Sequence, residues 1–177
     1  MNQFLSILQN YEKLEKLNTD FSDIVFTDEK YCISLSGGVD SMVLLDLLIK
    51  RGKTVVAIHI NYNNRPETTL EEKFLKEYCE QNTVHFICHN FAITRGSIRR
   101  NEYEEITKKI KFSLYKKVLE EHNLDCVLLA HHKDDIVENI YTNLCRGRNF
   151  LDLSVIKYQN KILDVTIIRP LLEYNKS

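Results

Sequence analysis

Residues 31–41 read YCISLSGGVDS and lead directly into MVLLDLLIK at 42–50. The first five residues form a short apolar run rich in strand formers, and the apolar residues after the loop recur at helical spacing. The segment therefore predicts a strand, a loop at 36–41 and a helix. Two glycines after a strand allow positive φ and a close backbone approach to a ligand, and a helix start offers unpaired N–H groups. Such a loop is typical of an anion-binding site.

The same order of elements continues along the rest of the chain. We expect strands at 54–61, 83–91 and 125–130, helices at 67–81, 102–122 and 136–146, and a last strand at 161–170. This alternation predicts an α/β fold: a doubly wound, mainly parallel, five-stranded sheet with helices on both faces. Ligands of such sheets bind beyond the carboxyl ends of the strands. Three polar loops follow strands at that edge, namely SGGVDS, HINYNNRPE and AHHKDD.

Composition limits the classes of protein to which the chain can belong. A length of 177 residues fits one domain of ordinary size. The net charge of −1 argues against a surface coated in basic residues. The apolar stretches are too short to span a membrane, and the first residues do not resemble a secretory signal, so we expect a cytoplasmic protein. The five cysteines form no CxxC pair and are expected to be reduced core thiols.

The side chains of the loop at 36–41 suit a bound phosphate. Ser36 and Ser41 supply hydroxyl groups, and the carboxylate of Asp40 can hold a magnesium ion on phosphate oxygens. The loop has neither the GxxxxGK[ST] nor the GxGxxG pattern. The alternative is an ordinary tight turn in which the Ser and Asp side chains cap the helix.

In its context, the string SGGVDS resembles the signature loop of the PP-loop ATP pyrophosphatases, which have the adenine nucleotide alpha hydrolase-like fold. The resemblance implies that the chain uses ATP and Mg²⁺ and cleaves ATP between the α and β phosphates. It also implies a set of ATP-binding residues: Ser36, Gly37, Gly38, Val39, Asp40 (also the Mg²⁺ contact, through phosphate), Ser41 and His59. For His59, a purely structural role in the second strand stays open.

Three further segments resemble the catalytic domain of the tRNA(Ile)-lysidine synthetases. HINYNNRPE is similar to the pattern HVNHGLRPES, LLAHHKDDIVENIYTNLCRGRNFLDLS to AHHxDDQxET...RG...GL, and IIRPLLEYNKS to RPLL...K. The resemblance implies a ligase that acts on tRNA and free L-lysine. In that reaction the carbonyl oxygen of the wobble cytidine of tRNA(Ile) attacks ATP, PPi leaves, and the lysine amine then displaces AMP from C2.

This resemblance implies roles for two groups of residues. Asp40, His132 and Asp135 are the catalytic candidates, with His132 and Asp135 in positioning and proton handling. The substrate-binding candidates are Asn61, Arg65, Glu67, Lys111, Glu138, Arg146 and Arg169. Each has a plainer reading as a helix cap or a solvated charge, and for His131 the functional and structural readings are evenly balanced.

Some positions depart from the lysidine synthetase pattern. Tyr62 replaces a His, Ile136 often a Gln, and Lys111 an Arg, which loses the rigid fork of a guanidinium. The chain ends just after RPLL, so we expect one domain over 1–177, with a helical extension at 1–30 and without the C-terminal tRNA-binding domains of the bacterial enzyme. A homodimer, a PP-loop tRNA 2-thiolation enzyme and a non-catalytic nucleotide-binding module stay open.

Overall fold

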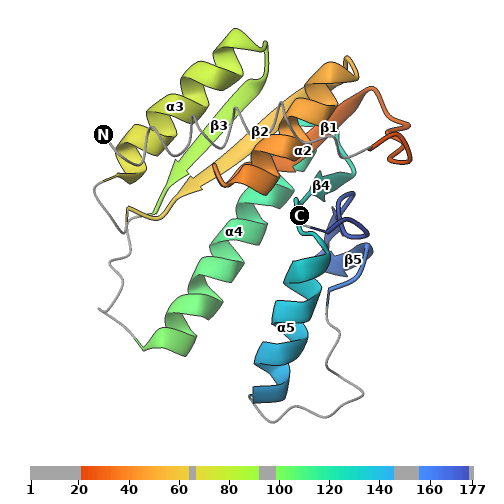
Figure 1. Ribbon diagram of the computed structural model, residues 1–177. Helices are drawn as coiled ribbons and strands as arrows, with labels where there is room; N and C mark the ends of the chain where they lie inside the picture. The colour runs from red at the N-terminus through yellow and green to blue at the C-terminus, as the bar shows by residue number, and fades with distance from the viewer. Residues whose placement is uncertain (1–20, 64–66, 92–98, 146–155, 176–177) are drawn as a thin grey trace.

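The computed structural model describes residues 21–63, 67–91, 99–145 and 156–175 (Figure 1). In chain order the elements are β1 (Lys30–Ser34), α2 (Val39–Lys50), β2 (Thr54–Asn61), α3 (Thr68–Gln81), β3 (His85–Asn90), α4 (Arg100–His122), β4 (Cys126–Leu128), α5 (Lys133–Cys145), β5 (Gln159–Ile162) and β6 (Val165–Ile168). The predicted alternation of strands and helices is confirmed.

The strands form one sheet in the order β3-β2-β1-β4-β6-β5, and every pair except β5–β6 is parallel. The chain winds outward from β1 through β2 and β3 in one direction and through β4 and β6 in the other. The winding direction therefore reverses between β1 and β4, where Cys32 lies opposite Val127 and Ile33 opposite Leu128. Ligands of doubly wound sheets bind beyond the carboxyl ends of the strands at such a reversal. The loops after β1 and β4 both begin there.

The prediction of five strands was wrong, because the segment 161–170 is a hairpin and not a single strand. β5 and β6 pair antiparallel across a two-residue turn made by Leu163 and Asp164. Both turn residues have positive φ, 45° and 67°, as a tight hairpin turn requires. Neither residue is Gly or Asn, so the sequence lacks the usual signal for this turn.

A stabilising substitution follows from this turn. Replacing Leu163 by Asn and Asp164 by Gly is expected to raise the free energy of unfolding by roughly 0.5–1 kcal/mol, because both residues tolerate positive φ better. Leu163 is 52% exposed, so little packing is lost. Urea denaturation followed by circular dichroism measures the change. An unchanged or lower midpoint would contradict the strain assigned to this turn.

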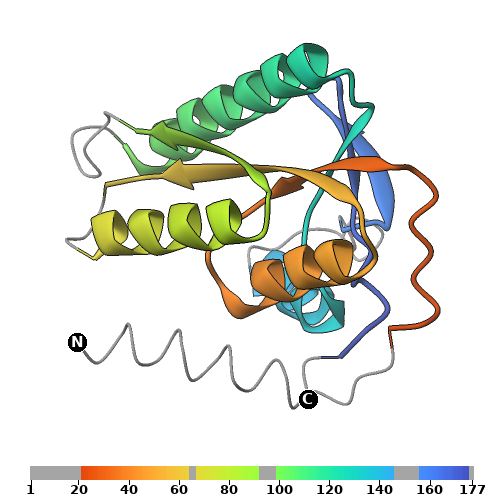
Figure 2. The ribbon, with the colours of Figure 1, turned by 90° about the horizontal axis from the view of Figure 1, so that it is seen from above.

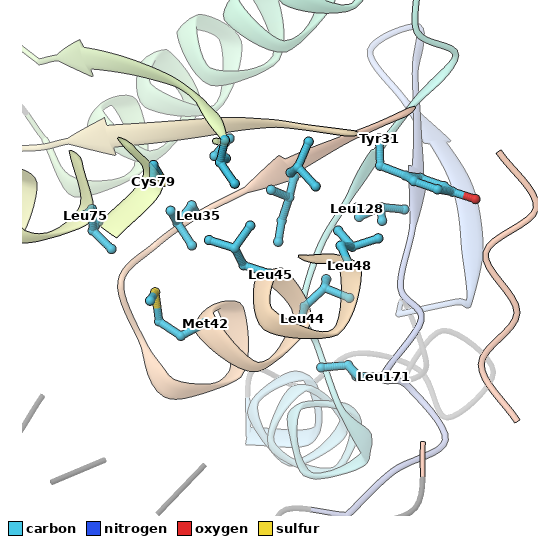
Figure 3. Close-up of a cluster of buried hydrophobic side chains, with 14 of the residues drawn as sticks. Tyr31, Leu35, Met42, Leu44, Leu45, Leu48, Leu75, Cys79, Leu128 and Leu171 are labelled. Carbon is cyan, nitrogen blue, oxygen red and sulfur yellow. The ribbon is translucent and has the colours of Figure 1, made fainter. Parts of the chain in front are cut away.

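The sheet separates two hydrophobic clusters. One cluster contains Tyr31 and Ile33 of β1 and Leu35, the residue just after β1, and is completed by α2 and α3 (Figure 3). The other contains Cys32 of β1 and is completed by α4. Figure 2 shows α4 on one face of the sheet and α2 and α3 on the other. Both faces are covered, as predicted for a doubly wound sheet, and side chains of β1 and β4 lie in both clusters. The position of the two central loops is therefore set by the best-packed part of the molecule.

The described part of the expected N-terminal helical extension contains no helix. Residues 21–29 contain a turn and a bend but no helix or strand, and the guanidinium of Arg51 donates hydrogen bonds to the carbonyls of Phe21 and Ile24. These bonds occupy carbonyl groups that a helix would use for its own ladder. Residues 1–20 lie outside the described residues. Among the helices described, none is long and apolar enough to cross a membrane.

Candidate active site

The loop between β1 and α2 is braced by its own hydroxyl groups. Ser36 Oγ accepts a hydrogen bond from the Gly38 amide (3.2 Å) and donates one to Ser41 Oγ (3.1 Å), while Ser41 Oγ donates to the Gly38 carbonyl (2.9 Å). Gly38 is the N-cap of α2 and has no side chain to cap it. The first turn of a helix leaves backbone N–H groups without intrahelical partners. The loop therefore presents a preformed cradle for an anion, with the positive end of α2 behind it.

Gly37 is required by the shape of this loop. Its φ is +83°, and a Cβ at this position would lie 3.3 Å from Leu75 Cδ1. We expect Gly37→Ala to lower the free energy of unfolding by about 1–2 kcal/mol, the range for a residue with Cβ forced into left-handed backbone, and to weaken ATP binding.

The matched control for Gly37→Ala is Gly52→Ala. Gly52 also has positive φ (+66°), but nothing lies within 4 Å of its Cβ position and it is outside the loop. Denaturant unfolding and ATP titration of both variants separate the two effects. Equal ATP affinity in the two variants would show that the conformation of Gly37 does not matter for binding.

The AHHKDD segment forms the loop after β4 and the first turn of α5. The His132 amide donates to Asp135 Oδ2 (2.8 Å), and the Asp134 amide donates to His132 Nδ1 (3.2 Å). The His132 side chain thus accepts from an amide in the first turn of α5, and the Asp135 side chain accepts from the amide just before the helix. This reciprocal pair of hydrogen bonds is similar to a capping box. The plainer reading of these residues as helix caps is thus physically present, and it fixes their side chains in one arrangement. α5 consequently begins at Lys133, three residues before the predicted start at 136.

The structure brings the three catalytic candidates together across the sheet reversal. His132 Nε2 lies 3.6 Å from Asp40 Oδ2 and 3.6 Å from Asp135 Oδ2. Because Nδ1 accepts the Asp134 amide hydrogen, neutral His132 carries its proton on Nε2. His132 is 8% exposed, so this N–H faces two carboxylates in a largely buried setting. The imidazole therefore lies between the loop at 36–41, from here on called the phosphate-type loop, and the acidic first turn of α5.

The residues at the end of β2 are bonded within the chain. His59 is buried, and its Nδ1 lies 2.8 Å from the Leu35 carbonyl, just before the loop at 36–41. Asn61 donates to Glu72 Oε2 (2.8 Å) and accepts from the Asn63 amide (2.9 Å). His59 therefore has a structural role, because its ring is bonded to Leu35, the residue that immediately precedes the loop. Asn61 holds the turn after β2.

Sequence reasoning missed Glu72. It lies on α3, eleven residues beyond Asn61, and the hydrogen bond from Asn61 is the main reason that its pKa is lowered. No short-range pattern signals this pair, because it depends on how α3 packs against the end of β2. Glu67, by contrast, lies immediately before α3 and makes no side-chain capping hydrogen bond.

Two cationic side chains, Lys111 and Arg169, lie near His131 in the loop after β4. Arg169, only 4% exposed, donates Nε to His131 Nδ1 (3.1 Å) and Nη1 to Asn160 Oδ1 (2.6 Å) and the Lys157 carbonyl (2.7 Å). The ammonium of Lys111 lies 5.5 Å from the ring centre of Tyr115, a cation–π distance. Burial, followed by the charge of Arg169, lowers the pKa of Lys111. Lys111, His131 and Arg169 thus form a half-buried basic region beside the loop.

The remaining candidates are less well placed by the structure. Arg65 and Arg146 lie outside the described residues. Glu138 is exposed on α5, one turn beyond Asp135. In the described ranges, no group of three or more His, Cys, Asp or Glu side chains is arranged so that it could hold a metal ion by itself. Mg²⁺ keeps several waters and binds few protein ligands when it is held on phosphates, so the single carboxylate of Asp40 fits an ion that arrives with ATP.

Comparison with known proteins agrees with this geometry. Residues 8–177 match the family described as "PP-loop domain". The chain is 35% identical over 152 residues to the tRNA(Ile)-lysidine synthase of Streptococcus sanguinis, covering 84% of this chain and 34% of that protein. It is 36% identical over 140 residues to the protein of the same name from Mycoplasmopsis pulmonis, covering 79% and 47%. The chain therefore spans between a third and a half of the length of these relatives.

Solved structures show the same fold. The U34-tRNA thiolase NcsA from Methanococcus maripaludis, solved with its [4Fe-4S] cluster, is similar with a TM-score of 0.65 and 20% identity, over 96% of this chain and 60% of that one. The phosphoadenylyl-sulfate reductase from Candida auris gives 0.54 and 13%, over 93% and 79%. With its glycine loop at a sheet reversal and a family match over nearly all of its length, the chain belongs to the PP-loop domain family, and its sequence resembles the tRNA(Ile)-lysidine synthases within it.

Proposed function

We propose that this chain is the catalytic PP-loop domain of a tRNA-modifying ligase that joins lysine to C2 of the wobble cytidine of tRNA(Ile), and that converts ATP to AMP and PPi. The observation that carries the proposal is the approach of Asp40, His132 and Asp135, which sets a phosphate-type loop beside an acid–base group. The names of the sequence relatives support tRNA as the substrate. The proposal places residues 1–177 in one domain that acts in the cytoplasm.

The first step needs stabilisation of negative charge on the phosphates. The loop amides, including that of Val39 in the first turn of α2, bind the pyrophosphate together with the Ser36 and Ser41 hydroxyls. Asp40 would hold Mg²⁺, which would supply positive charge to the phosphates of the leaving group. Fixed dipoles and charges of this kind usually supply the largest part of catalysis in phosphoryl chemistry. His59 positions the loop through Leu35.

The second step needs a neutral lysine amine. Asp135 accepts a proton from the incoming ammonium, and His132 lies between the two carboxylates, with Nε2 3.6 Å from Oδ2 of both Asp135 and Asp40. General bases of this kind contribute typically 10²–10⁴-fold to a rate. Lys111 and Arg169 supply positive charge to the substrate side. Glu138 and Glu67 supply negative charge for a cationic group of free lysine other than the amine that attacks. Asn61, Arg65 and Arg146 complete the proposed substrate contacts.

A tRNA 2-thiolation enzyme is the second candidate, because a solved thiolase has the same fold. Three of the five cysteines have thiols that do not favour it. Burial raises the pKa of the Cys32, Cys79 and Cys88 thiols to about 12, and a thiol must ionise to attack or to bind a metal. Within the described ranges, these side chains also do not gather into a cluster-binding set.

The test is PPi and AMP release by the full chain with ATP, Mg²⁺ and bulk tRNA. The ligase proposal predicts AMP formation that depends on lysine and is not supported by ornithine, together with a lysine-bearing cytidine in the nucleoside mass spectrum. Product formation with sulfide in place of lysine would indicate thiolation. ATP binding without any turnover would indicate a non-catalytic module, and sedimentation of the same sample distinguishes monomer from homodimer.

A further inference from the structure

The first histidine of the pair, His131, is held by a buried guanidinium. Arg169 follows β6, is 4% exposed, and donates its Nε–H to His131 Nδ1 (3.1 Å). Its Nη1 is fixed by Asn160 Oδ1 and the Lys157 carbonyl, both at the start of the β5–β6 hairpin. Arg169 is therefore anchored at several points, and its position relative to the imidazole is set by the hairpin.

The direction of this hydrogen bond determines where His131 carries its proton. A guanidinium has only donors, so the imidazole nitrogen facing it must accept. His131 is then neutral with its proton on Nε2, because an imidazolium has no acceptor nitrogen to offer. Protonation of Nδ1 would break the bond to Arg169 and place two cations in contact.

The groups around the ring favour the neutral form as well. Arg169 comes from the end of β6, Lys111 from α4, His132 from the same loop and Asp135 from α5. Burial is the main cause that lowers the pKa of His131, Arg169 is the second, and Asp135 alone opposes them. The ring is consequently uncharged at neutral pH.

The Nε2–H group of His131 is available to a ligand. In the described part of the chain no hydrogen bond to it is formed, and no buried side-chain nitrogen or oxygen there is left without a partner. Nε2 is therefore in contact with solvent. His131 belongs to the loop after β4, the same loop in which His132 Nε2 lies 3.6 Å from Asp40 Oδ2, and this loop begins beside the loop after β1 at the sheet reversal.

We propose that His131 is a neutral hydrogen-bond donor to an anionic oxygen of the bound nucleotide, and that Arg169 is a positioning residue that fixes the donor tautomer. The inference rests on the proposed function for its ligand, ATP. An anionic oxygen is the acceptor that Lys111 and Arg169 favour electrostatically. Arg169 in this role does not itself contact substrate, which refines its assignment as a substrate-binding residue.

The test uses nitrogen-15 NMR of histidine-labelled full-length protein, with His131→Gln to assign the signals. Wild type should show a non-protonated Nδ1 and a protonated Nε2 for His131, retained to lower pH than an ordinary histidine. Adding Mg²⁺ and ATP should shift the Nε2–H signal. A protonated Nδ1 in wild type would overturn the proposal without any variant, and an Nε2–H signal unmoved by saturating ATP would overturn the nucleotide contact.

Variants separate the hydrogen bond from the charge. Arg169→Leu should raise the pKa of His131 and mix its tautomers, whereas Arg169→Gln, which keeps a donor, should retain the Nε2–H form. Arg100→Leu removes an exposed arginine and should leave the His131 signals unchanged. A similar response to Arg100→Leu and Arg169→Leu would refute the role of Arg169.

Kinetics then test whether the donor matters for turnover. His131→Ala is expected to lower kcat by about 10²-fold, the effect of losing one preorganised donor, with partial rescue in His131→Gln. If wild type shows no lysine-dependent turnover, the proposed function fails, while the tautomer and the ATP-induced shift still decide this inference. Equal kcat in His131→Ala and wild type would show that the His131 donor does not contribute to turnover.

Discussion

Replacing Asp40 by Asn is expected to lower the rate of PPi release by roughly 10²–10³-fold, the usual effect of removing one electrostatic contributor to a transition state. Asn has nearly the same shape as Asp, so the first turn of α2 and its contact with His132 should persist. What is lost is the negative charge that, in the proposed function, would hold Mg²⁺. Rates are measured at saturating ATP with the full chain, lysine and tRNA.

The matched control for Asp40→Asn is Asp46→Asn on the same helix. Asp46 forms an (i, i+4) ion pair with Lys50, away from the loop, and such pairs contribute only a few tenths of a kcal/mol. Its turnover should equal that of wild type. If Asp40→Asn kept wild-type turnover with intact folding, the phosphate loop would not be the site of ATP cleavage and the proposed function would be wrong.

Replacing Asp135 by Asn is expected to lower lysine-dependent AMP formation by about 10²-fold or more, because a general base typically contributes 10²–10⁴-fold. The amide oxygen of Asn can still accept the hydrogen bond from the His132 backbone, so the start of α5 should survive. The substitution therefore removes basicity with little change in shape. Thermal melting of the variant within a few degrees of wild type checks this point.

Asp134→Asn is the control for Asp135→Asn. Asp134 lies in the same first turn of α5, with the same relation to the helix dipole, but its carboxylate lies on the Nδ1 side of His132, 3.8 Å away, and is 52% exposed. We expect its turnover to stay within a few-fold of wild type. Equal losses in both variants would assign the effect to the helix start and not to a base.

Much of the fold is predictable from the sequence because periodicity and turn residues act locally. β2 occupies 54–61 as predicted, and α3 and α4 start within two residues of the expected positions. The β5–β6 hairpin was not predicted because its turn begins with Leu163 at positive φ and contains neither glycine nor asparagine. The start of α5 was placed too late because the capping groups, His132 and Asp135, are not standard cap residues in this pairing.

The candidate site is predictable only in part, because some of its contacts depend on strand register and helix packing, which no local sequence pattern encodes. Order along the chain and parallel pairing place the loops after β1 and β4 at one edge, so the approach of Asp40 to His132 follows from the topology. The bond between Arg169 and His131 depends on the register of β4 against β6, which no local pattern encodes. The same holds for Asn61 and Glu72, which meet through the packing of α3.

The central position of β1 and β4 has a consequence for how the protein loses activity on heating. Side chains such as Cys32, Ile33 and Val127 are fully buried, and segments of this kind open last, often only when the whole domain unfolds. Amide hydrogens of these two strands should therefore be among the slowest to exchange with deuterated water. The two halves of the site would then stay in place until the sheet itself melts, and inactivation and melting would share one midpoint.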